Sequence, residues 1–247
     1  MDRFSIDEAV ARGAIPGAES FSGFGERTTT GAETDFVVWP NGAFSIPAEG
    51  GVQMALASTS ADDAAAGTGI QAVEIDYLDG RRDPQTEVVE LDGITPVNTA
   101  ATDISFIQCM HLSTAGSGLK AAGDISATNG GTTYSLIQTG KVRCSSSMRM
   151  VPRGKRLFLT GTVGSSISGT SAARTQLYLV ASMIHGQKFT YPLVLFPFAA
   201  IGVQDTAIPA VFSGMPPIPS GVVVGITHTS DKAATVSGTW FGRLEGE

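Results

Sequence analysis

Apolar and polar residues alternate at a period of two through much of this chain, and turn residues interrupt the alternation at short intervals. In "RTQLYLVASMI" (174–184), for example, Leu177, Leu179 and Met183 share one parity. Such alternation is typical of an antiparallel strand that packs one face on a core. Gly and Pro supply the turn geometry in segments such as "LDGRRDP" (78–84) and "MPPIPSG" (215–221). The pattern predicts an all-β fold, an antiparallel β-sandwich that is jelly-roll-like.

The predicted strands share this alternation and lie between turn signals. They cover 35–39, 52–57, 70–78, 86–91, 104–112, 133–138, 156–163, 174–184, 188–199, 221–228 and 234–244. The chain has 247 residues and is 42% hydrophobic, enough for one large all-β domain or two small ones. Because we see no internal repeat and no clear linker, we expect a single sandwich domain over residues 35–247. Trp240 and Leu244, in the last predicted strand, should pack in its core.

The N-terminal segment, residues 1–34, is predicted to be an arm outside the sandwich. It begins with a short helix over 5–13, in which Ser5 and Glu8 have the spacing of a capping box, and continues irregularly. We expect its apolar side chains to bind a partner subunit; the alternative is that the arm covers an open edge of its own sheet. These candidate partner-binding residues are Phe4, Ile6, Val10, Ile15, Phe21 and Phe24.

The chemistry of an enzyme finds little support in the sequence. The three histidines, His111, His185 and His228, are not close in sequence, and no GxSxG motif marks a nucleophile. We therefore predict no catalytic residues, no metal and no cofactor, although an all-β glycosidase would need only two carboxylates and no short motif. One acidic stretch is compatible with calcium or with outward strand residues and a turn. It comprises Glu74, Asp76, Asp79, Asp83 and Glu87.

Charge and hydropathy restrict the partners. The net charge is −7, and no Lys/Arg cluster is dense enough to follow a nucleic-acid backbone. The basic stretch 141–156 is either a patch for an acidic partner or a solvated connection. No apolar run reaches the length of a membrane helix and no signal peptide is apparent, so we expect a soluble protein made in a cytoplasm. Cys109 and Cys144 are expected to be buried thiols, with a single bridge as the alternative.

Three segments carry a resemblance to a known family. "STSADDAAAGTGIQAVEIDYLDG" (58–80), "TEVVELDGITPVNTA" (86–100) and "STAGSGLKAAGDISAT" (113–128) resemble a pattern of virion structural proteins of tailed bacteriophages, notably marine ones. That pattern runs "S-x-D-x-x-A-G-T-G", a strand, a "G-L-D" turn, a strand with "L-N-G" and "T-P-V", and then "T-A-G-S-x-G-x-N-A-G-x-I". The entry segment 24–47 is also similar, with "VVWPNG" in place of "I-W-D-G-G". The C-terminal half matches only in its strand pattern.

The resemblance implies a structural protein of the virion, made in the host cytoplasm. The first expectation is a capsid-decorating (cement) protein that sits as a homotrimer on the major capsid protein. The alternative is a tail-associated or host-attachment module that binds a cell-surface glycan; an all-β hydrolase is a third. The small residues of 58–69 can make either a loop packed flat against a neighbouring chain or a mobile loop.

Overall fold

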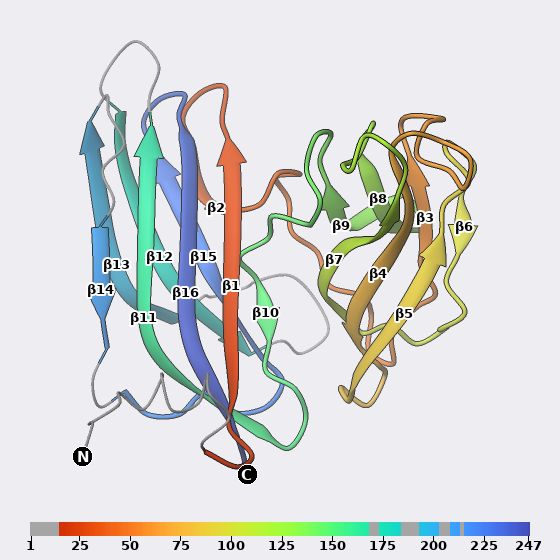
Figure 1. Ribbon diagram of the computed structural model, residues 1–247. Coiled ribbons are helices and arrows are strands. Elements are labelled where there is room, and N and C mark those ends of the chain that lie inside the picture. The colour runs from red at the N-terminus through yellow and green to blue at the C-terminus, as the bar shows by residue number, and fades with distance from the viewer. Residues whose placement is uncertain (1–14, 168–172, 184–192, 203–207, 213–214) are drawn as a thin grey trace, which may run out of the picture. The chain divides into compact units, whose positions relative to one another are not determined.

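The computed structural model describes residues 15–167, 173–183, 193–202, 208–212 and 215–247, and every regular element in these ranges is a β-strand (Figure 1). The chain divides into two compact units. Unit 1 comprises Met1–Gly42, Ser147–Ile184 and Phe189–Glu247, and unit 2 comprises Ala43–Ser146 with His185–Lys188. Unit 1 is therefore assembled from both ends of the chain, whereas unit 2 is formed mainly by one continuous stretch.

Unit 1 is a sandwich of two antiparallel sheets. One sheet has the order β1-β16-β11-β14, and the other has the order β10-β15-β12-β13 with β2 also paired to β15. The strands are β1 (Glu19–Thr28), β2 (Glu33–Val37), β10 (Arg149–Met150), β11 (Lys155–Ile167), β12 (Ala173–Met183), β13 (Leu193–Gly202), β14 (Ile208–Val211), β15 (Val222–Ser230) and β16 (Thr235–Gly246).

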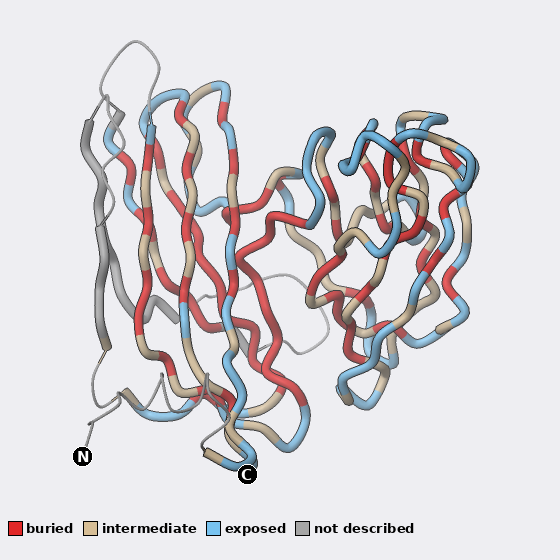
Figure 2. The backbone as a smooth tube through the Cα atoms, viewed as in Figure 1, coloured by how far each residue is buried: buried red, intermediate tan, exposed pale blue. Residues whose placement is uncertain are grey.

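The core of unit 1 lies between these sheets because inward residues of both form one buried cluster. Leu159 of β11 and Trp240 of β16 meet Leu179 of β12 and Ile226 of β15 in this cluster. Figure 2 shows buried and more exposed residues alternating along β1 and β16, the signature of strands with one face on a core. Trp240 is fully buried, and its Nε1 donates a hydrogen bond to the carbonyl of Ser147 (2.7 Å).

Unit 2 has its own pair of antiparallel sheets and its own core. The sheet orders are β6-β3-β8-β9 and β5-β4-β7. Leu56 and Ile125 from the first sheet and Ile75 and Met110 from the second belong to one buried cluster. The strands are β3 (Ala55–Ser58), β4 (Ile70–Leu78), β5 (Pro84–Glu90), β6 (Val97–Asn98), β7 (Phe106–Ala115), β8 (Ile125–Asn129) and β9 (Thr132–Ile137).

The predicted fold class, an antiparallel β-sandwich, is confirmed, and each predicted strand overlaps an observed one. The burial of Trp240 and Leu244 is also confirmed. The division of the chain differs from the predicted single domain over 35–247. No linker marks the two units because the chain leaves unit 1 and returns to it between strands of similar composition. The predicted helix over 5–13 lies outside the described residues.

Part of the predicted arm is a strand of the sandwich. β1 pairs with β16 along its whole length, from Glu19 opposite Leu244 to Thr28 opposite Thr235. The irregular arm predicted for 14–34 is therefore corrected over this range. The sequence disguises β1 because its inward positions include Gly23 and Gly25. A Cβ at Gly23 would overlap the Trp240 ring, and one at Gly25 would overlap the backbone carbonyl of Val38.

Candidate functional site

Asp63 of unit 2 is a fully buried carboxylate at the meeting point of three loops. Its Oδ1 accepts hydrogen bonds from the backbone amides of Ile70 (2.7 Å) and Ala122 (2.9 Å). Its Oδ2 accepts from Ser58 Oγ (2.6 Å) and from the amide of Gly123 (2.9 Å). A buried carboxylate is stable only when its oxygens are satisfied in this way. Asp63 therefore fixes the loop 58–69 to the segment 122–123.

Backbone hydrogen bonds join the same loops directly. The amide of Gly93 donates to the carbonyl of Asp63 (2.8 Å), and the amide of Ser58 donates to the carbonyl of Gly93 (2.8 Å). On the other side, the amide of Gly116 donates to Gly69 (2.9 Å) and that of Gly118 to Thr68 (2.7 Å). The loops 58–69, 91–95 and 115–124 thus form one hydrogen-bonded assembly, here called the Asp63 cluster.

Two glycines show how closely these loops approach one another. A Cβ at Gly69 would overlap the Asp63 carboxylate, and one at Gly116 would overlap the carbonyl of Gly67. The small residues of 58–69 are therefore needed for packing within unit 2. The loop is packed, as one of the two interpretations held, but the surface against which it packs belongs to its own chain.

The Asp63 cluster presents two apolar side chains to solvent. Leu119 is 69% exposed and Ile94 is 65% exposed, the highest values among large apolar side chains in the described part of the chain. Leu119 also has a φ of 55°, in the left-handed region that branched, bulky residues avoid. The family pattern quoted above has Gly at this position. Leu119 is thus both strained and exposed.

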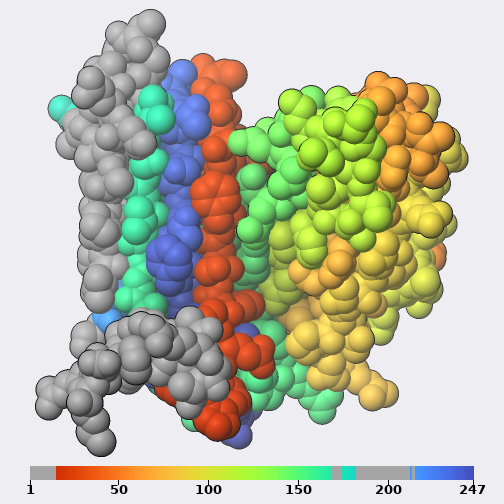
Figure 3. Space-filling view, in the orientation of Figure 1, coloured from red at the N-terminus to blue at the C-terminus, as the bar shows by residue number. Residues whose placement is uncertain are grey.

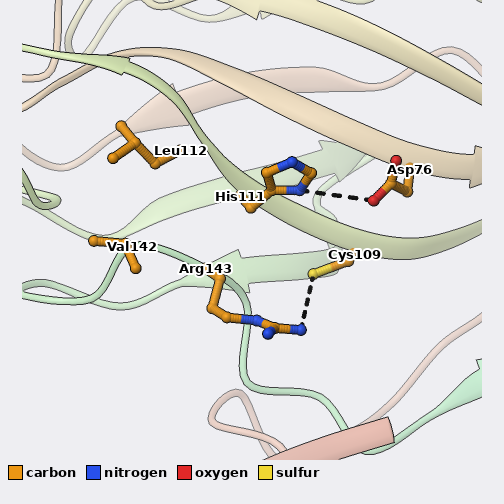
Figure 4. Close-up of a pocket in the computed structure, with 6 residues that line it drawn as sticks. All are labelled: Asp76, Cys109, His111, Leu112, Val142 and Arg143. Carbon is orange, nitrogen blue, oxygen red and sulfur yellow. Dashed lines mark hydrogen bonds and ion pairs between the residues drawn. The ribbon is translucent and has the colours of Figure 1, made fainter. Parts of the chain in front are cut away.

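A second feature of unit 2 is a pocket of about 520 Å³ beside β7. Figure 4 shows the residues that line it, with the Cys109 thiol and the Arg143 guanidinium close together. The side chains share no single chemistry, since they include an acid, a thiol, an imidazole and a guanidinium. They are Asp76, Cys109, His111, Leu112, Val142 and Arg143.

Cys109, which lines this pocket, lies next to Cys144, with 3.1 Å between the two sulfurs. Cys109 belongs to β7, and Cys144 belongs to a segment that runs beside β7. The amide of Cys144 donates to the carbonyl of Met110 (2.8 Å), and that of Leu112 donates to Val142 (2.8 Å). Both cysteines are buried, as the sequence predicts, and both are thiols in the structure.

The residues of the acidic stretch make separate contacts rather than forming one site. Glu74 and Asp76 flank His111, with Glu74 Oε1 3.7 Å from Nε2 and Asp76 Oδ2 3.6 Å from Nδ1. Asp79 accepts from the amides of the 79–83 turn, and Glu87 accepts from the amides of 100 and 101. Among the described residues, no group of three or more His, Cys, Asp or Glu side chains could hold a metal ion.

Unit 1 contains a buried cluster of charged groups near the edges of its two sheets. Arg27 of β1 forms a two-pronged ion pair with Glu33 of β2, with Arg27 Nε 2.6 Å from Oε2. Fully buried His228 of β15 places Nε2 3.1 Å from Glu33 Oε2, without the geometry of a hydrogen bond. The hydrogen bond from Arg27 lowers the pKa of Glu33, and burial lowers the pKa of His228.

The predicted partner-binding residues occupy different environments where the structure describes them. Phe4, Ile6 and Val10 lie outside the described residues. Ile15 is half-buried, and Phe21 packs edge-on against Trp240, with ring centroids 5.6 Å apart. Phe24 is 37% exposed on the outer face of β1.

The outer face of the β1-β16-β11 sheet collects further apolar groups. Opposite pairs in the register are Phe24 with Thr239 and Ser22 with Phe241, so Phe24 and Phe241 are diagonal neighbours on one face. Phe241 is 44% exposed, and Ile167 on β11 is 45% exposed. Figure 3 shows the three strands running side by side with this face toward the viewer. Serine and threonine hydroxyls fill the positions between them, as in the pair Ser165 and Ser237 (2.8 Å).

Both tryptophans are structural. Trp39 is 1% exposed and donates from Nε1 to the carbonyl of Gly42 (3.0 Å), and Trp240 is buried in the core of unit 1. Neither can therefore stack on a sugar ring at the surface. No helix in the described part of the chain is long and apolar enough to cross a membrane.

Comparison with known proteins leaves the family of this chain open. No protein-family model and no curated protein matches it. Among solved structures, a structure of the Gx strain of infectious bursal disease virus aligns over 92% of this chain and 71% of its own, with 8% identity and a TM-score of 0.24. The VP2 subviral particle of the same virus aligns over 93% and 76%, with 9% identity and a TM-score of 0.18. TM-scores of this size do not establish a common fold.

The sequence did not indicate the central role of Asp63. The acidic pair Asp62 and Asp63 looks like any polar loop, and nothing local shows that one carboxylate is exposed and the other buried. The family pattern quoted above does not choose between them. Its Asp stands three residues before the Ala of Ala-Gly-Thr-Gly, as Asp63 does before Ala66, but also two residues after a Ser, as Asp62 does after Ser60.

Proposed function

We propose that this chain is a structural protein of a bacteriophage virion and that it decorates the capsid as a cement protein. The observation that supports the proposal is the meeting of three resembling segments at Asp63. They are separate in sequence, yet loops 58–69, 91–95 and 115–124 form one hydrogen-bonded assembly. Residue patterns that recur together across a family are expected when they build one local structure. The resemblance is thus consistent with the packing of unit 2.

Leu119 and Ile94 are the residues that we propose contact a neighbouring virion protein. Burying a large apolar side chain stabilises an interface by about 1.5–3 kcal/mol. A leucine at a left-handed position costs roughly 1–2 kcal/mol relative to a residue suited to it. Backbone strain of this kind tends to be kept at functional sites. A contact with the major capsid protein or another virion protein would offset the strain and cover both side chains.

The outer face of the β1-β16-β11 sheet is the second proposed contact, and it is assigned to neighbouring copies of this chain. Phe24 and Phe241 would supply the apolar centre and the surrounding hydroxyls a polar rim, the usual composition of an interface. Phe4, Ile6 and Val10 retain their predicted role as docking residues. A homotrimer is the expected oligomer.

Antibody labelling of the phage that encodes this chain tests the function. An antibody raised against the purified protein should label the whole surface of the head in electron micrographs. Label confined to the tail would replace the cement role by the tail-associated one. Particles that carry no label, while a capsid antibody binds them, would contradict any virion role.

A matched pair of variants tests the contact residues. Leu119→Asn places a residue that tolerates the left-handed region at the strained position and removes the apolar group. Thr128→Asn, on β8 away from the cluster, is the control. If Leu119 contacts a partner, Leu119→Asn should fold normally. It should bind phage heads from which this chain has been removed at least tenfold more weakly than the control does. Equal binding of both variants would remove Leu119 from the interface.

A further inference from the structure

The two thiols of unit 2 are placed to react with one another. The sulfurs of Cys109 and Cys144 are 3.1 Å apart, and a disulfide needs about 2.0 Å, so a shift of about 1 Å closes the bond. Cys109 is 8% exposed and Cys144 is 2% exposed, so an external reagent meets the two sulfurs unequally. Cys109 lines the pocket beside β7, which gives such a reagent a route to it.

The Arg143 guanidinium favours reaction at Cys109. The Arg143 guanidinium lies 3.9 Å from the Cys109 sulfur, as the dashed line in Figure 4 marks. A positive neighbour stabilises a thiolate relative to a thiol, and the thiolate is the form that attacks. Arg143 is held in place because its backbone is paired with that of His111 in β7.

We propose that Cys109 and Cys144 are an oxidisable pair, in which Cys109 reacts first with a small-molecule disulfide and Cys144 completes an intramolecular bridge. The Cys109 thiolate attacks one sulfur of the reagent, forms a mixed disulfide and releases one thiolate. The Cys144 thiolate then attacks the Cys109 sulfur and releases the second. The protein loses two protons and two electrons, and the reagent gains them as two thiols.

The bridge would fasten the segment 142–144 to β7 covalently. At present that segment is held to β7 by a few backbone hydrogen bonds, from Leu112 to Val142 and from Cys144 to Met110. The bond would also close a long loop that contains β8 and β9, and closing a long loop restricts the unfolded chain. The pairing is a property of unit 2 alone and does not require the proposed virion role.

Oxidised glutathione and the folded, reduced full-length protein test the pairing. The reactive thiol count should fall from two to zero, the mass should fall by about 2 Da, and a peptide containing Cys109 should be linked to one containing Cys144. The melting temperature should rise by about 5–10 °C. Retention of both thiols, or bridges that join two chains instead, would overturn the proposal.

Single variants test the order of the two steps. In Cys144→Ser, Cys109 should stop at the mixed disulfide with glutathione. In Cys109→Ser, Cys144 should react at least tenfold more slowly because it is shielded. Arg143→Gln should slow the first step several-fold, and Arg143→Lys, which keeps the charge, should restore much of the rate. Equal rates for the two serine variants would overturn the assignment of Cys109 as the first thiol to react.

Discussion

Asp63→Asn is the perturbation that tests the Asp63 cluster most closely, because it changes one oxygen of the carboxylate to an NH₂ group and preserves its shape. At the Oδ1 position the NH₂ group would face the amides of Ile70 and Ala122, which can only donate. At the Oδ2 position it would face the amide of Gly123 and the hydroxyl of Ser58, which can turn to accept. The second orientation is better, although it leaves the amide of Gly123 without an acceptor and reverses the hydrogen bond with Ser58.

The cost follows from these contacts. The unpaired, buried amide of Gly123 costs about 1–3 kcal/mol, and the two bonds accepted at Oδ1 each lose about 0.5–1 kcal/mol because a neutral amide replaces a charged acceptor. The free energy of unfolding of unit 2 should therefore fall by about 2–5 kcal/mol. Asp62→Asn makes the same chemical change on the exposed neighbour and should alter stability by less than about 0.5 kcal/mol.

Hydrogen exchange followed by mass spectrometry is the suitable assay because it reports on each loop separately. In Asp63→Asn, peptides that contain Ile70 and Gly123 should lose protection from exchange. Peptides from β11 and β16 of unit 1 serve as controls within the same sample and should keep their protection. Urea unfolding gives the change in free energy. If Asp63→Asn and Asp62→Asn exchange and unfold alike, the hydrogen bonds assigned to Asp63 do not hold the loops together.

The remaining predictions concern unit 1 and the strained loop. Trp240→Ala should destabilise unit 1 by about 3–5 kcal/mol, seen as a lower urea midpoint, because a fully buried ring is removed. Leu119→Asn should leave stability unchanged or raise it by up to about 1 kcal/mol, and a loss of more than this would show that Leu119 packs within its own unit. Unit 1 should lose stability as pH falls below 6.5, because the pKa of His228 is lowered in the folded state and the unfolded state therefore binds the proton first. It should lose stability again below 4.5, because the pKa of Glu33 is also lowered in the folded state. His228→Gln should abolish the first of these two decreases in urea titrations at stepped pH, and its persistence would mean that another group titrates.

The strands that the sequence predicts best are those whose inward residues are apolar. β4 (Ile70–Leu78) has the predicted bounds because Val73, Ile75 and Tyr77 point inward between charged residues. β1 was not predicted because Gly23, Gly25 and Arg27 occupy inward positions while Phe24 points outward, which reverses the usual pattern. The glycines are needed because other parts of unit 1 pack directly on the backbone of β1. That requirement exists only once the strands have been assembled.

The candidate sites were less predictable than the strands because each one joins segments that are distant in sequence. The role of Asp63 depends on its contacts with Gly93 and Gly123, which are distant in sequence. The two thiols lie together only because the segment 142–144 runs along β7. The sequence left the state of the cysteines open for this reason. Likewise, Leu119 looks like an ordinary loop residue until its backbone angle is known. Local sequence patterns predict the strands, but they do not predict which loops meet.

Quantitative mass spectrometry of purified phage particles tests the proposed capsid role most directly. The amount of this chain should be measured against that of the major capsid protein in the same particles, with peptide standards for both. If this chain is a cement protein that covers the head, its ratio to the major capsid protein should be fixed and set by the number of lattice positions it occupies. Its amount should be far above that of any tail protein. A ratio as low as that of the tail proteins, or absence from washed particles, would contradict the account.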